Sequence, residues 1–105
     1  MATGVFSSGN LESLVIPSNV KYTERGAFEY NSNLKVVYIE EGVEEIGYET
    51  FDECRQLEEL HIPASVTTFV DDFIVDSTDI LTIYAPAGSA AEEYAHSHDI
   101  NFIEE

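Results

Sequence analysis

The stretches NLESLVIPSNV (10–20), NLKVVYIEEGV (33–43) and QLEELHIPASV (56–66) carry the same pattern three times. The first leucine of each copy lies 23 residues after the one before it, at Leu11, Leu34 and Leu57. A fixed period in the twenties means that each copy is one structural unit and that neighbouring units stack to bury a continuous core. The sequence therefore predicts a repeat solenoid.

Each copy has apolar residues in the order L-x-x-L-x-I, and the alternation over the last two predicts a short strand with one buried face. The predicted inward residues are Leu14 and Ile16, Val37 and Ile39, and Leu60 and Ile62. Pro17 and Pro63 follow two of the strands and end them, because proline has no N–H to give to a neighbouring strand. Glu40 takes that place in the middle copy.

Further apolar residues follow each strand and predict a second buried wall of the solenoid. They are Val20, Val43 and Val66, then Thr23, Ile46 and Phe69, and finally Phe28, Phe51 and Ile74.

The complete pattern, L-x-x-L-x-I-P-x-x-V-x-x-I-G-x-x-x-F-x-x-C, resembles the BspA-type bacterial leucine-rich repeat. The middle copy matches best, with Ile46-Gly47, Phe51 and Cys54 all in place. The outer copies depart from the pattern at Thr23 and Asn31 and at Val70 and Ser77. The resemblance covers about residues 5–103. It implies a short α/β leucine-rich repeat solenoid of about three 23-residue coils, with a parallel sheet on one face.

We expect a single domain with a cap at its C-terminal end. The expected parts are a partial coil over 1–10, repeats over 11–33, 34–56 and 57–79, and a strand–helix–strand cap over 80–105. In the cap, Leu81 and Ile83 belong to a strand, and Ser89 and Glu92 form a capping box for a helix that runs to about His98. The apolar stripe of the helix is Ala91, Tyr94 and Ala95, and a final strand holds Ile100, Phe102 and Ile103.

The charge is strongly unbalanced, with 4 Lys and Arg against 21 Asp and Glu in 105 residues, a formal net charge of −17. Such a chain repels phosphate backbones and anionic lipid headgroups, which argues against nucleic acid and membrane-surface partners. No apolar run approaches the roughly 20 residues that span a bilayer, so we expect no membrane insertion. The acids are spread along the chain, which favours a solvated surface; a cationic partner or weak calcium binding is the alternative.

No residues form a recognisable catalytic or metal-binding pattern. His96 and His98 point to different sides of the predicted helix, and His61 lies far away on an outward strand position. Cys54, the only cysteine, cannot form an internal disulfide and fills the family's buried position. The six glycines are scattered singly and form no phosphate-binding loop. We expect no enzyme activity, cofactor or metal.

The outward strand positions are the candidate partner-binding face. Stacking the strands aligns two rows, Val15, Tyr38, His61 and Thr82, and beside them Ser13, Val36, Glu59 and Ile80. An apolar patch with an aromatic centre and a polar rim is typical of protein-binding sites. The strand preference of β-branched and aromatic residues explains the same pattern without any partner.

The resemblance implies a non-enzymatic binding module of a bacterial cell-surface or secreted protein that adheres to host or matrix proteins. Residues 1–4 have no features of a signal peptide, so a targeting signal would lie outside this chain. Two alternatives stay open. The repeats serve as a spacer or capping domain of a larger protein, or they form a weak homodimer through the incomplete N-terminal coil.

Overall fold

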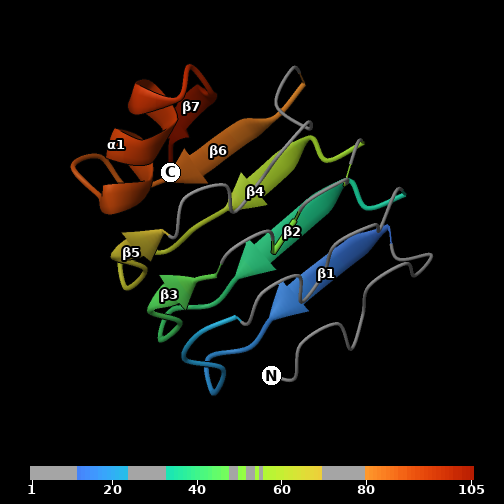
Figure 1. Ribbon diagram of the computed structural model, residues 1–105, viewed down its shortest axis with the longest axis vertical. Coiled ribbons are helices and arrows are strands. Elements are labelled where there is room, and N and C mark those ends of the chain that lie inside the picture. The colour runs from blue at the N-terminus through green and yellow to red at the C-terminus, as the bar shows by residue number, and fades with distance from the viewer. Residues whose placement is uncertain (1–11, 24–32, 48–49, 52–53, 55, 70–79) are drawn as a thin grey trace.

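The computed structural model describes residues 12–23, 33–47, 50–51, 54, 56–69 and 80–105. Five parallel strands form the main sheet in the order β1 (Ser13–Ile16), β2 (Val36–Ile39), β4 (Glu59–His61), β6 (Thr82–Ala85) and β7 (Asn101–Glu104). A second sheet pairs β3 (Glu45–Ile46) with β5 (Thr68–Phe69). The only helix of the described residues is α1 (Ala90–Ser97). Figure 1 shows the main strands side by side, with β3 and β5 along one flank.

The 23-residue period sets the register of the main sheet. Leu14 pairs with Val37, Val37 with Leu60, and Leu60 with Ile83, so each inward residue stacks on its equivalent in the next coil. Val37, Leu60 and Ile83 are fully buried, whereas Leu14 in the first described strand is only partly buried. The predicted solenoid with a parallel sheet on one face is confirmed.

The position of the repeat that holds Pro17, Glu40 and Pro63 lies at the end of each strand, and Glu40 also contacts the preceding coil. β1 ends at Ile16, directly before Pro17, and β4 ends one residue before the predicted Ile62. In the middle coil, the Glu40 carboxylate accepts a hydrogen bond of 3.0 Å from the backbone N–H of Ser18. The glutamate therefore satisfies a backbone donor of the preceding turn.

The described part of the second wall contains predicted apolar residues together with two buried threonines, Thr23 and Thr50. Val43, Val66 and Ile46 are fully buried, and Phe51 and Cys54 lie in the same core. Val20 and Phe69 are partly buried and pack against it. The predicted inward residues Phe28 and Ile74 lie outside the described residues.

Thr23, which replaces the isoleucine of the repeat pattern, is only 1% exposed and is hydrogen-bonded to the next coil. Its hydroxyl oxygen accepts from the N–H of Gly47 at 2.8 Å and lies 2.8 Å from the hydroxyl of Thr50. Thr50 gives its single hydroxyl proton to the Gly47 carbonyl at 2.7 Å. Thr23 must therefore donate its own proton to Thr50, and all three polar groups are satisfied.

The C-terminal cap is the predicted strand–helix–strand unit. The Ser89 side chain accepts from the N–H of Glu92 at 3.2 Å, and the Glu92 carboxylate accepts from the N–H of Gly88 at 2.7 Å. Both groups satisfy backbone donors at the start of α1. Ala91 and Ala95 are buried, which leaves the other face of the helix in solvent.

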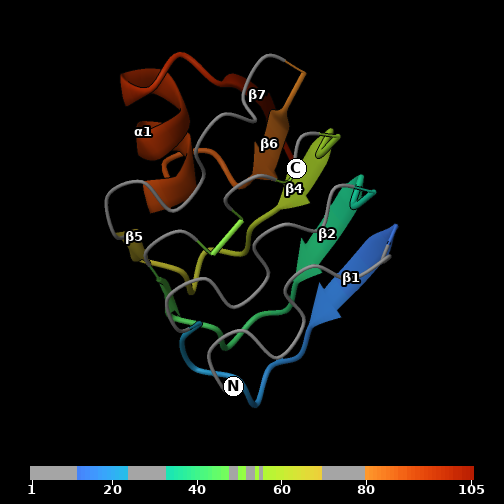
Figure 2. The same ribbon diagram turned by 45° about the vertical axis from the view of Figure 1, so that its right-hand side comes forward.

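The helix leads directly into the last strand. Asp99 adopts a left-handed backbone with φ of 56°, and the N–H of Ile100 donates to the carbonyl of Ala95 at 2.9 Å. β7 then pairs in parallel with β6 and extends the sheet of the repeats. Figure 2 shows the main strands next to one another along one side of the molecule, with α1 and β5 on the opposite side. No helix within the described ranges is long and apolar enough to cross a bilayer.

Candidate functional site

The outward residues of the five parallel strands form two adjacent rows. The outer row consists of Val15, Tyr38, His61, Tyr84 and Ile103. The second row consists of Ser13, Val36, Glu59, Thr82 and Asn101. Each row is straight because neighbouring strands are in register, without slips or bulges between them.

The sequence-based rows are right over the first three strands and wrong at the fourth. Thr82 lies beside Glu59 in the second row, and Tyr84 takes the position beside His61. Ile80 precedes the strand and, although 51% exposed, belongs to neither row. The sequence pattern aligns Leu81 and Ile83 with the L-x-I positions of the other strands, which shifts the fourth strand by two residues. Leu81 and Ile83 are both fully buried, but Leu81 precedes β6, and Ile83 is the residue that pairs with Leu60. Ile83 and Ala85 therefore take the L-x-I positions of β6, and the small alanine hides the pattern.

Three rings of the outer row are stacked. The Tyr38 and His61 ring centroids are 4.4 Å apart with an interplanar angle of 16°, and those of His61 and Tyr84 are 4.5 Å apart at 13°. Neighbouring strands lie about 4.8 Å apart, so rings at equivalent positions of parallel strands meet face to face. The histidine is therefore held between two tyrosines.

Two carboxylates fix the His61 ring from either side. Its Nε2 lies 3.0 Å from Glu59 Oε1, and its Nδ1 lies 2.7 Å from Glu105 Oε1. The side chain of His61 is only 13% exposed, so its role is chiefly to order the row around it. Glu105 is 44 residues away in sequence, and no sequence pattern indicated this contact.

The most accessible apolar side chains of the sheet lie in the same row. Val15 is 52% exposed, Tyr38 47% and Ile103 50%. Sequence reasoning did not include Tyr84 and Ile103 in this face. The signal for Tyr84 was the repeat period itself, since it lies 23 residues after His61. Ile103 had no such signal, because α1 lies between β6 and β7 and breaks the period.

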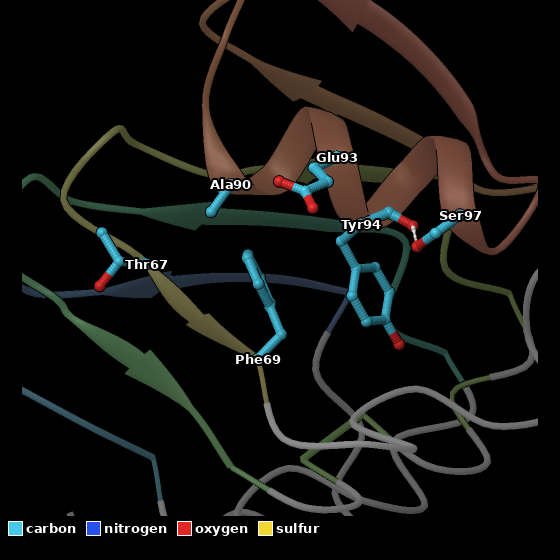
Figure 3. Close-up of a pocket in the computed structure, with 6 residues that line it drawn as sticks. All are labelled: Thr67, Phe69, Ala90, Glu93, Tyr94 and Ser97. Atoms are coloured by element: carbon cyan, nitrogen blue, oxygen red, sulfur yellow. Dashed lines mark hydrogen bonds between the residues drawn. The ribbon is translucent and has the colours of Figure 1, made fainter.

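A shallow, open pocket of about 240 Å³ lies between β5 and α1. Thr67, Phe69, Ala90, Glu93, Tyr94 and Ser97 line it, as Figure 3 shows. The Phe69 and Tyr94 rings are 5.1 Å apart, and the Ser97 hydroxyl is directed to the Tyr94 carbonyl. Its ionisable side chains are Glu93 and the Tyr94 phenol, and its hydroxyl groups belong to Thr67 and Ser97.

The remaining histidines make local contacts on α1 and near its end. His96 Nε2 lies 3.2 Å from a Glu92 carboxylate oxygen, and the His98 ring stacks on Tyr94 at 4.0 Å. Hydrogen bonds from the Gly88 N–H and from His96 lower the pKa of Glu92. In the part of the chain that the structure describes, no three His, Cys, Asp or Glu residues gather to hold a metal ion.

Comparison with known proteins identifies the repeats. A family model described as "BspA type Leucine rich repeat region (6 copies)" matches residues 1–88, which extends through β6 to the start of the α1 cap. No curated protein and no solved structure matches the chain significantly. Repeat modules of this kind are typically non-enzymatic, mediate protein interactions and occur on surface or secreted proteins. The match covers most of the sequence and agrees with the stacked coils, and the chain belongs to the BspA-type leucine-rich repeat family.

Proposed function

We propose that this chain is an adhesion module of a bacterial cell-surface or secreted protein and that it binds host or matrix proteins through the outer face of the main sheet. Tyr38 is the anchor of this contact, and Val15 and Ile103 extend it along the outer row. Ser13, Val36 and Thr82 form the polar and β-branched rim beside them.

The alignment of half-exposed apolar side chains carries this proposal. Val15, Tyr38 and Ile103 come from the first, second and last strands of the sheet, yet they project from one row. Aromatic residues near the centre of an exposed apolar row are the usual anchors of protein interfaces. The stacked His61 ring restricts Tyr38 before a partner arrives, which reduces the entropy lost on binding.

The test is capture of proteins from serum and from an extracellular-matrix extract by the immobilised chain. In a Val15→Thr, Tyr38→Thr variant, threonine keeps the strand preference but removes the apolar and aromatic surface. Tyr22→Thr is the matched control, because Tyr22 is 52% exposed and bridges to Glu45 on the other wall. We expect the unmodified chain and the control to capture the same protein and the double variant to lose it.

Capture that survives in the folded double variant would place the binding site elsewhere. If no protein is captured by any of the three, a spacer or capping role becomes the better explanation. Sedimentation of the unmodified chain distinguishes the remaining alternative, since a homodimer formed through the N-terminal coil would appear as a concentration-dependent increase in mass.

A further inference from the structure

We infer that the partner presents an extended, positively charged segment to the outer row of the sheet, and that arginine or lysine and apolar residues share the face of the segment that is turned to this row. This inference rests on the proposed function and specifies the partner's chemistry. It is supported by the carboxylates around His61, the charge of the chain and the length of the row.

The two carboxylates beside His61 each have an oxygen left for a partner. Glu59 and Glu105 use Oε1 to contact the histidine, and their side chains are 40% and 49% exposed. Their Oε2 atoms make no hydrogen bond to any residue that the structure describes. Because His61 holds both groups in place, the centre of the row has two oriented acceptors on either side of a stack of rings. A guanidinium or ammonium group is the complementary donor.

Among the described residues, His61 is the only basic side chain that contacts these two acids. All ion pairs of the described residues involve histidine, and neither Lys21 nor Lys35 takes part in one. With a net charge of −17, a second copy of this chain would be repelled from the same face. A basic protein segment is attracted instead, and its association is accelerated at low ionic strength.

The dimensions favour a short extended segment. Five strands about 4.8 Å apart give a row about 19 Å long, which is roughly six residues of extended chain at about 3.3 Å each. The apolar residues of such a segment would contact Val15, Tyr38 and Ile103. Successive side chains of an extended chain point to opposite sides, so the basic and apolar residues that face the sheet occupy every second position of the segment. The basic residues would lay their methylene groups over the tyrosine rings while their charged ends reach Glu59 and Glu105.

The experiment is calorimetric titration of the whole chain with an eight-residue peptide in which arginine and valine alternate along one face and serine occupies every second position. The control peptide carries glutamate in place of arginine. The test variant is Glu59→Gln with Glu105→Gln, since the glutamine amide can hydrogen-bond to either ring nitrogen of His61, as donor or acceptor, but has no charge. The matched control is Glu44→Gln with Glu93→Gln, which changes the net charge equally at two exposed acids away from the outer row.

We expect the arginine peptide to bind and the glutamate peptide not to bind. The Glu59, Glu105 variant should weaken binding about tenfold, whereas the Glu44, Glu93 variant should change it by less than about twofold. Equal weakening in both variants would mean that only net charge attracts the peptide and would overturn the inference. Absence of binding, or equal binding of the two peptides, would overturn it too.

The same variants separate this inference from the proposed function. If the serum or matrix partner is lost with Val15→Thr, Tyr38→Thr but retained with Glu59→Gln, Glu105→Gln, the face binds protein without a basic segment. Thermal melting of each variant, followed by circular dichroism, shows whether the variant is folded, so that a loss of binding is not confused with unfolding.

Discussion

The inner and outer faces of the main sheet consist of alternating residues of the same strands, but the two faces differ in how deeply their side chains are buried. On the inner face, Val37, Leu60 and Ile83 are fully buried and stack coil on coil. On the outer face, Tyr38 is half exposed and packs mainly against its neighbour His61. Burial therefore constrains the residues of the inner face, whereas the half-exposed positions of the outer face are free of that constraint.

The largest effect should come from the inner face. Leu60→Ala removes most of a fully buried side chain in the middle of the stack and leaves a cavity. We expect a loss of about 3 kcal/mol in the free energy of unfolding, measured by urea denaturation. A loss below about 1 kcal/mol would show that the coils readjust around the cavity. The inner face would then contribute no more to stability than we expect of the outer face.

A substitution in the buried hydroxyl network of Thr23 and Thr50 tests whether polar contacts also stabilise the inner side of the solenoid. Thr23→Val keeps the shape of the side chain but leaves the Gly47 N–H without its acceptor. We expect a destabilisation of about 2 kcal/mol. Thr68→Val, at an exposed position of β5, is the control and should remain within about 0.5 kcal/mol of the unmodified chain. Equal effects at the two threonines would contradict the hydrogen bonds assigned here.

The outer face should contribute less to stability than to binding. Val15→Thr with Tyr38→Thr removes the exposed apolar area and the stacking on His61, so we expect a loss of about 1 kcal/mol in thermal denaturation. Loss of partner capture should accompany it. Destabilisation as large as that of Leu60→Ala would mean that the outer row is a structural element in its own right.

The smallest effect concerns an exposed group at the cap. Hydrogen bonds from the Gly88 N–H and from His96 lower the pKa of Glu92, so the folded state favours its ionised form. The stabilisation is complete above the ordinary pKa of 4.5 and is lost as the pH falls through the lowered value in the folded state. The melting temperature of Glu92→Gln should therefore be below that of the unmodified chain at pH 6, and the two should converge in acid. A difference that persists unchanged to pH 2 would assign the effect to something other than this carboxylate.

Much of the architecture was predictable from local patterns. The L-x-I alternation predicted the inward residues of three strands, and Ser89 with Glu92 predicted the start of the helix. The candidate face was predicted only in part. Thr82 lies in the second row and Ile80 in neither row. The pattern predicts otherwise because β6 has Ala85 at the second inward position, and Leu81 and Ile83 match the L-x-I spacing instead.

The sequence by itself determined the coil, because a 23-residue period forces equivalent residues to stack and places Leu60 inward and Tyr38 outward. Only the tertiary structure decided what the outer face contains. The return of β7 beside β6 adds Ile103 to the outer row and brings Glu105 to His61, 44 residues earlier. The helix breaks the repeat period, so no local pattern specifies that contact. It exists because the packing of α1 on the core returns the chain to the edge of the same sheet.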